Sequence, residues 1–264
     1  MPQRIEVDLI DRVQPLVREL VASRARGLAH LSHADIRVAV TEGRFASAEN
    51  GAPRASGENS AFAFGIRVLA GHRAIAPGYF GRVLGTADID RLADRLGQGL
   101  LAAHRRAVAS AEMKADVRDK FGSLGEALAD TRLCPVPIAR AVVPPVFEVD
   151  PRAVGLDEMA RLAAEVSREV AALVRIEHNH VAATTQLSRE LFASSEGALV
   201  DQSFALTQGM CHVVASGDGN RQELYDVMGH QRGWEVLRRG VDESLMAFPP
   251  FLSFALALAR DAAE

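Results

Sequence analysis

The feature that most constrains the fold is a change of hydrophobic period, which occurs twice along the chain. In each half, apolar residues three and four positions apart give way to a stretch in which apolar and polar residues alternate. The first alternating positions are Ile36, Val38, Val40, Phe62, Phe64, Ile66 and Val68. The second alternating region runs from Val174 to about Ala215. Alternation at a period of two is typical of half-buried strands joined as an antiparallel meander.

Amphipathic helices are predicted before and after these strands. The first stripe runs from Leu9 to Val21, Thr86 is a suitable N-cap for a second helix, and Asp157 is one for a third. A last helical run begins at Pro249. The order helix, meander, helix thus occurs twice. It indicates an α+β class in which antiparallel meanders pack against long amphipathic helices.

Prolines separate the two regions, at Pro135, Pro137, Pro144, Pro145 and Pro151. Stretches dense in proline are typical of linkers and extended segments. We therefore predict a helix, a meander and a helix over residues 1–130, and a proline-rich connection over 131–155. A helix, a second meander and a C-terminal helix are predicted over 156–264. The pattern leaves open whether these regions form two lobes or one continuous sheet.

Charge and composition narrow the classes of function. The net charge is −4 and the pI is near 6.1, so the basic surface that phosphate-backbone binding requires is lacking and no nucleic-acid partner is expected. No apolar run approaches the ~20 residues that cross a bilayer, and the first residues do not resemble a signal peptide. We expect a cytoplasmic protein without a membrane partner. Cys134 and Cys211 are expected to be buried thiols.

The densest group of potential metal ligands is the run Glu177, His178, Asn179 and His180. On a strand, His178 and His180 share one face, so a metal could bind both, with His212, Cys211 or Glu190 as candidates for a third ligand. Neighbouring Cys211 and His212 would point to opposite faces. The alternative is two histidines on a half-exposed strand. Because no third ligand can be located from the sequence, we favour the strand.

Two polar stretches are predicted to be turns or loops. Ser194 to Gly197 lies between apolar segments and predicts a hairpin turn, although Ser195 and Glu196 could present a hydroxyl and a carboxylate. Ser216 to Gln222 lacks the ligand pattern of a calcium loop and predicts a flexible loop. Residues 49–60 are also rich in turn formers.

Several segments together resemble the TldD/PmbA family, whose members are also called modulators of DNA gyrase. They are the segment GENSAFAFGIRVLAGHRAIAPGYFG, the helix from Thr86, the segment SSEGALVDQSFALTQGMCHVVASGDG, and GWEVL followed by a helix. Within them, Gly65 to Val68 resembles the family's Gly-x-x-x-Arg-Val strand in a shortened form. Ser194 to Gly197 resembles its Asn/Ser-Ser-Glu-Gly turn. The resemblance covers nearly the whole chain.

The resemblance implies a zinc metallopeptidase, a hydrolase that acts on peptides or unfolded proteins. In the family, a His-Glu-x-x-x-His helix and a later Cys in the C-terminal half hold the zinc, and the N-terminal domain helps to enclose the substrate. That motif is absent from residues 1–264. We therefore expect an N-terminal, substrate-enclosing and dimerising domain without catalytic, cofactor-binding or metal residues of its own. Its expected partners are a substrate and a second subunit, in a homodimer or a TldD/TldE-like heterodimer.

Two alternatives stay open. A non-enzymatic module could bind a peptide or protein, for example by adding a strand to a sheet edge. At the C-terminus, Phe251, Phe254, Ala255 and Leu258 form an apolar helical face. This face predicts either contact with a partner or packing against the chain's own sheet.

Overall fold

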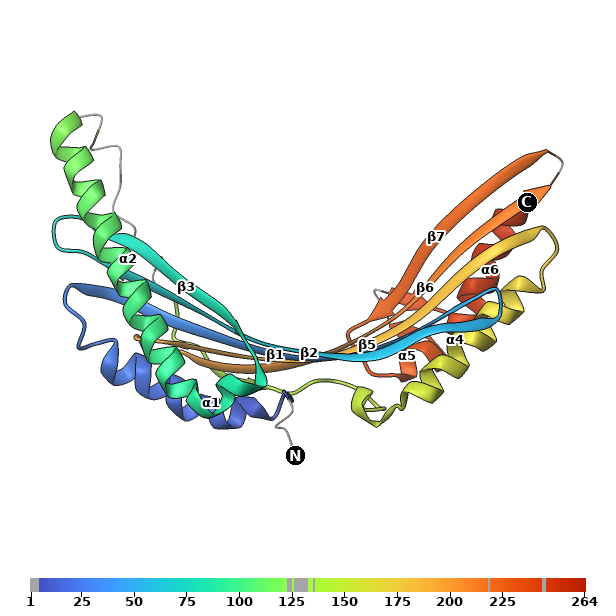
Figure 1. Ribbon diagram of the computed structural model, residues 1–264, viewed down its shortest axis with the longest axis horizontal. Coiled ribbons are helices and arrows are strands. Elements are labelled where there is room, and N and C mark those ends of the chain that lie inside the picture. Colours follow the sequence, from blue (N-terminus) through green and yellow to red (C-terminus); the bar gives the residue numbers. More distant parts are fainter. Residues whose placement is uncertain (1–4, 123–124, 126–132, 135, 218, 244–245) are drawn as a thin grey trace. The chain divides into compact units, whose positions relative to one another are not determined.

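The computed structural model describes the whole chain except residues 1–4, 123–124, 126–132, 135, 218 and 244–245. The helices are α1 (Leu9–Glu19), the π-helix η1 (Leu20–Arg24), the 3₁₀ helix η2 (Thr86–Arg91), α2 (Leu92–Phe121), the 3₁₀ helix η3 (Pro151–Ala153), α4 (Leu156–Ala171), α5 (Glu235–Arg239) and α6 (Phe251–Ala263). The strands are β1 (Leu31–Glu49), β2 (Ala52–Ala70), β3 (Ala76–Leu84), β4 (Arg140–Val143), β5 (Ile176–Ser194), β6 (Leu199–Gly217), β7 (Asn220–His230), β8 (Val241–Glu243) and β9 (Met246–Phe248). The predicted α+β class, with helix, meander and helix occurring twice, is confirmed (Figure 1).

Seven strands form one sheet, in the order β3-β2-β1-β5-β6-β4, with β7 also paired to β6. The strands β2 and β3 pair antiparallel, as do β6 and β7. The proline-rich connection contains one strand that the sequence did not predict. This strand, β4, pairs in parallel with the start of β6. Four residues with no alternating pattern leave little local signal for a strand.

The four long strands, β1, β2, β5 and β6, have 19 residues each. Two of the loop predictions are therefore wrong. Within residues 49–60 the chain turns only at Asn50 and Gly51, and β2 begins at Ala52. Near Ser216, β6 continues to Gly217, which pairs with Asn220 at the start of β7. The strand residues of both stretches have largely exposed polar side chains, while backbone pairing keeps them extended. Asp218, within the second predicted loop, lies outside the described residues.

The chain divides into two compact units. Unit 1 comprises Met1–Thr41, Ala61–Val143 and Arg189–Gln202, and unit 2 comprises Glu42–Ser60, Pro144–Ser188 and Ser203–Glu264. The long strands change unit along their length, so each unit draws residues from both predicted blocks, 1–130 and 156–264. The predicted boundary at residue 130 lies outside the described residues.

In unit 1, the long helix α2 lies along β3 (Figure 1). Its buried positions are mostly small and four residues apart: Gly99, Ala103, Ala107, Ala111 and Ala115. A Cβ at Gly78 of β3 would meet the backbone of Ala103 and Ala107, so the helix approaches the strand closely. Small residues at this spacing permit that approach. Phe62 and Ile66 of β2 and Leu100 of α2 are buried in this unit.

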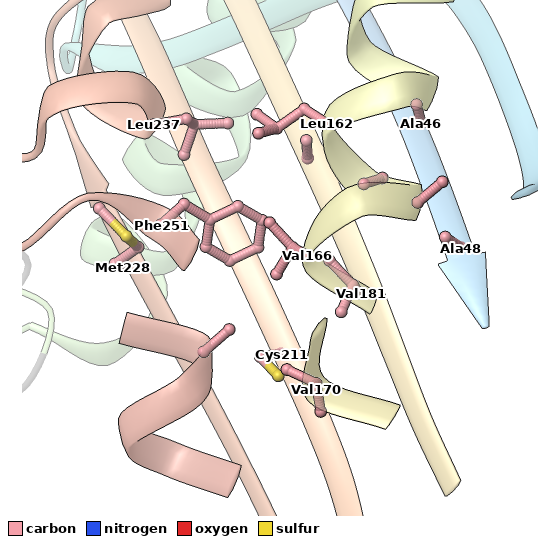
Figure 2. Close-up of a cluster of buried hydrophobic side chains, with 14 of the residues drawn as sticks. Ala46, Ala48, Leu162, Val166, Val170, Val181, Cys211, Met228, Leu237 and Phe251 are labelled. Atoms are coloured by element: carbon pink, nitrogen blue, oxygen red, sulfur yellow. The ribbon is translucent and has the colours of Figure 1, made fainter. Parts of the chain in front are cut away.

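The core of unit 2 gathers side chains from α4, α5 and α6 against β5, β6 and β7 (Figure 2). The ring of Phe251 lies directly over Gly209, where a Cβ would come within 2.5 Å of a ring carbon. The buried face of α6 consists of Phe251, Ala255, Ala259 and Ala262. The apolar face predicted for this helix therefore packs against its own unit. Phe254 and Leu258 lie at the edge of that face and are only partly buried.

Local predictions fail at three smaller points. The helices η2 and α4 begin after Gly85 and Gly155, so Thr86 and Asp157 lie in the first turn and are not the N-caps. Cys134 is exposed, whereas Cys211 is buried in the core, where burial raises the pKa of its thiol to about 12.

Among the described residues, no helix combines the length and the apolar character required to cross a bilayer.

Candidate functional site

A cluster of four charged or titratable side chains lies on the sheet of unit 1. We call His33, Asp35, Arg67 and Glu196 the charged cluster. Alternation along β1 places Ala34, Ile36 and Val38 in the core and therefore turns His33 and Asp35 to the other face. Even so, His33 and Asp35 are only 4% and 7% exposed. Buried charged groups require partners, and the other two residues provide them.

The geometry of the charged cluster is specific. The Nδ1 atom of His33 lies 2.7 Å from Oε1 of Glu196, and its Nε2 atom lies 2.8 Å from Oδ2 of Asp35. Arg67 donates to the same Asp35 oxygen from Nε at 2.7 Å and contacts it from Nη2 at 2.6 Å. Burial opposes a charge on His33, but its hydrogen bonds to Asp35 and Glu196 outweigh that effect and raise its pKa above 6.5.

The predicted turn at Ser194 to Gly197 is confirmed, and it is fixed to the first strand. Ser195 donates its backbone N–H to the carbonyl of Ala34 at 2.8 Å, and its Oγ accepts from the N–H of Ala34 at 3.0 Å. Arg26 donates to the carbonyl of Ser195 at 2.9 Å. The hydroxyl of Ser195 thus serves the backbone, and both nitrogens of His33 face carboxylates. This is not the pairing of nucleophile and base that hydrolysis by serine would need.

A hollow of about 230 Å³ lies on the same unit, lined by Arg37, Glu190, Phe192, Val200 and Gln202. Glu190 accepts a long hydrogen bond from Gln202 at 3.4 Å. Glu190 was a candidate for a third metal ligand. It lies in unit 1, whereas His178 and His180 belong to unit 2.

Unit 2 has a second hollow, of about 240 Å³, on the face of its sheet that does not hold the core cluster. Its lining includes Phe45, Asn59, Thr184, Gln186, Leu206 and Gln208. On β5 the buried residues Val181, Ala183 and Thr185 alternate with half-buried Thr184 and Gln186, so this face carries mainly uncharged polar side chains.

The structure places His178 and His180 on β5, as predicted for a strand. His178 lies 3.4 Å from the side-chain nitrogen of Asn50 and 3.7 Å from Glu49. Its ring centroid is 6.0 Å from that of His212, which instead contacts Glu223 at 2.7 Å. Cys211 points into the core. Within the described part of the chain, no three His, Cys, Asp or Glu side chains are arranged to hold a metal ion.

Sequence reasoning missed the charged cluster, although one signal was present. His33, Asp35 and Arg37 alternate with apolar residues on a strand, and three consecutive outward positions with titratable or charged groups are a weak sign of a polar site. In the sequence, Arg67 stands out only as part of a short motif, and Glu196 only as a carboxylate of the predicted turn. Nothing in the local sequence indicates that they contact β1.

Comparisons with known proteins identify the fold. A candidate modulator of DNA gyrase from Bacteroides thetaiotaomicron has a TM-score of 0.60 at 10% identity, and TldE from Thermococcus kodakarensis has 0.58 at 11%. A candidate modulator of a DNA gyrase from Thermotoga maritima has 0.52 at 12%. The matches cover 96%, 95% and 97% of this chain, but only 48%, 46% and 46% of those chains. The chain therefore spans about half the length of these solved structures. No curated protein sequence matches it.

Sequence comparison adds the family. Residues 149–264 match the model of the PmbA/TldA metallopeptidase central domain. The sequence led us to expect an N-terminal domain. The matched model describes a central domain, so this expectation changes for the second half of the chain. The match over residues 149–264 and the shared fold confirm the resemblance to the TldD/PmbA family.

Proposed function

We propose that this chain is the non-catalytic, substrate-enclosing part of a TldD/PmbA-type zinc metallopeptidase that acts on peptides or unfolded proteins. The observation that carries the proposal is a hollow on the face of the unit 2 sheet that does not hold the core. Helices α4, α5 and α6 contribute to the core on one face of this sheet. The other face has a hollow whose wall combines carboxamides, hydroxyls and two apolar side chains.

The chemistry of this hollow suits an extended peptide. The carboxamides of Asn59, Gln186 and Gln208 each donate and accept hydrogen bonds, as the main chain of an unfolded peptide does. Phe45, 39% exposed, and Leu206 can contact an apolar side chain. Arg44 also lines the hollow, but it contacts Glu58 at 2.9 Å and donates to the carbonyls of Arg152 and Val154. A lining without an uncompensated charge favours peptides of many sequences.

The zinc of such an enzyme would be held by residues outside this chain. His178 and His212 do not fit that role, because each contacts another side chain and, among the described residues, no three His, Cys, Asp or Glu side chains are arranged to hold a metal ion. We therefore derive no catalytic step from the residues of this chain. Its contribution would be to bind and orient the substrate.

Peptide binding tests the proposal. We expect the 264-residue chain to bind a fluorescein-labelled unstructured peptide in an anisotropy titration, and Phe45→Ala to raise Kd about tenfold. Val83→Ala is the matched control, because Val83 is 72% exposed on β3 in unit 1. It should leave Kd unchanged. Absence of binding, or equal losses in both variants, would contradict the proposal. If the natural protein binds the peptide but never cleaves it, the alternative of a non-enzymatic binding module is favoured.

We also propose that the chain pairs with a second copy or a related subunit. The support is a stripe of exposed apolar residues on α2, formed by Met113, Val117 and Phe121 at intervals of four. Light scattering after size-exclusion chromatography should give twice the mass of 28.4 kDa. A monomer that remains monomeric when mixed with related subunits would contradict the pairing.

A further inference from the structure

We propose that the Ser194–Gly197 turn of unit 1 is held to β1 by a proton on His33, so that losing this proton loosens the turn. The interacting groups are the imidazole of His33 and the carboxylate of Glu196, which comes from a position 163 residues away. The turn would respond to protons whether or not unit 2 binds peptides.

The two carboxylates beside His33 require two donors from its ring. An ionised carboxylate can only accept hydrogen bonds, and a neutral imidazole has only one N–H. His33 meets a carboxylate oxygen at each ring nitrogen, at 2.7 and 2.8 Å. Both contacts are hydrogen bonds only when both nitrogens carry a proton. A neutral His33 would leave one nitrogen lone pair facing a negative oxygen, which is repulsive.

The environment decides which contact breaks. Asp35 is held by Arg67 on β2, and its side chain is only 10% exposed. The side chain of Glu196 is 56% exposed and can turn into water. After deprotonation, the remaining N–H of His33 therefore stays with Asp35. Glu196 separates from the ring.

The other charged groups near the cluster do not replace the lost proton. Arg26 donates to the carbonyl of Ser195, and Arg140 on β4 donates to the carbonyl of Gly197 at 3.1 Å. Tyr79 on β3 interacts with Arg67. These contacts hold the backbone of the turn or the far side of Asp35. None of them is a contact to the imidazole.

The direction of the pH effect follows from the raised pKa of His33. A group whose pKa is higher in the folded state stabilises that state fully below its unfolded pKa of about 6.5. This contribution is lost as the pH rises through the folded value. The turn should therefore be held tightly in mild acid and loosen from neutral to mildly alkaline pH. The two hydrogen bonds between Ser195 and Ala34 remain, one to the carbonyl of Ala34 and one to the hydroxyl of Ser195, so the turn opens more often and does not unfold.

Amide hydrogen exchange measures this opening. In the 264-residue chain, we compare the protection of the Ser195 and Ala34 amides at about pH 6 and about pH 8.5, corrected for intrinsic exchange, while the ring nitrogens of His33 are followed by NMR. We expect protection to fall about tenfold at the higher pH, as loss of one charge-assisted bond to a half-exposed partner implies. The Met159 and Phe254 amides of unit 2, which donate to the carbonyls of Gly155 and Pro250, are the internal control, and their corrected protection should stay constant.

Glu196→Gln is the decisive variant. Its carboxamide can accept from the imidazolium or donate to the neutral ring, so the turn should stay closed at both pH values, with a change of less than about twofold. Because Glu196 is half-exposed, Glu196→Gln should fold. The test therefore does not depend on the folding of a variant at the buried His33, such as His33→Gln. His72→Gln, which removes the ring packed 4.9 Å from His30, should keep the full pH effect. A flat profile in the natural chain, or an unchanged profile in Glu196→Gln, overturns the proposal.

Discussion

Two hairpin turns of this protein are fixed in opposite ways. The Asn50–Gly51 turn in unit 2, which we call the neutral turn, is bound by uncharged groups. Ser167 of α4 accepts from the N–H of Gly51 at 2.8 Å, and Asn179 donates from its backbone to Oδ1 of Asn50 at 2.8 Å. Ser167 and Asn179 are fully buried. The Ser194–Gly197 turn in unit 1, which we call the charged turn, depends in part on His33 and Glu196.

The difference shows how burial selects the chemistry of an anchor. The buried pair of the neutral turn is uncharged and bonded to itself: Asn179 donates from Nδ2 to the carbonyl of Ser167 at 3.1 Å and accepts from the hydroxyl of Ser167. Such a network does not titrate near neutral pH. The charged turn has a half-exposed member, and its strength therefore depends on the proton of His33.

Breaking the neutral network should have the largest effect. Asn179→Ala leaves the hydroxyl and carbonyl of Ser167 without their buried partners, and it should lower the free energy of unfolding of unit 2 by about 3 kcal/mol. The single tryptophan, Trp234, is buried in unit 2, so its fluorescence in urea reports this change. Gln98→Ala, an exposed carboxamide on α2, should change stability by less than about 0.5 kcal/mol. Equal effects of the two variants would refute the role of the network.

Removing the cation of the charged cluster comes next. Arg67→Met deprives the buried carboxylate of Asp35 of its guanidinium and should destabilise unit 1 by about 2 kcal/mol, followed by far-UV circular dichroism in urea. Arg73→Met is the control, because the pair of Arg73 with Asp116 is exposed on both sides. Exposed pairs contribute little, so the control should lose less than about 0.5 kcal/mol. If the control loses as much, burial does not set the strength of the cluster.

The glycines of the two turns compare backbone strain. Gly197 has φ +101° and Gly51 has φ +81°, and both values disfavour a side chain. We expect Gly197→Ala to cost about 1.5 kcal/mol and Gly51→Ala about 1 kcal/mol, because φ near +100° lies farther from the left-handed region that L-residues tolerate. Gly65→Ala is the control, since a Cβ there meets nothing within 4 Å. Urea unfolding of all three variants gives the order, and a reversed order would refute the strain argument.

The smallest effect is expected for the histidine beside the neutral turn. His178 makes only a long contact of 3.4 Å with Asn50, which keeps its other bonds. His178→Ala should therefore change stability by less than about 0.5 kcal/mol. The zinc content of the purified chain, measured by mass spectrometry, should be the same in both proteins. Stoichiometric zinc that is lost in the variant would restore the metal hypothesis for His178 and His180.

The sequence predicted some features of the site and could not predict others. The strand at residues 177–180 and the turn at Ser194 to Gly197 followed from period and turn chemistry, because both are local. The charged cluster did not, because Glu196 and Arg67 reach β1 only through strand pairing across long separations. The polar residues 52–60 suggested loops. They form a strand, since backbone hydrogen bonds between neighbouring strands do not require apolar side chains.

By itself, the sequence determined the α+β class, the apolar faces of the long helices, and the residue types that make a turn at Ser194 to Gly197. These features depend on residues a few positions apart, and local spacing records them. Tertiary structure alone decided the length of the strands, the packing of α6 against its own sheet, and the partners of His33. The reason is physical: burial of His33 and Asp35 depends on which distant segments cover them, and only the folded sheet brings Arg67 and Glu196 to that place.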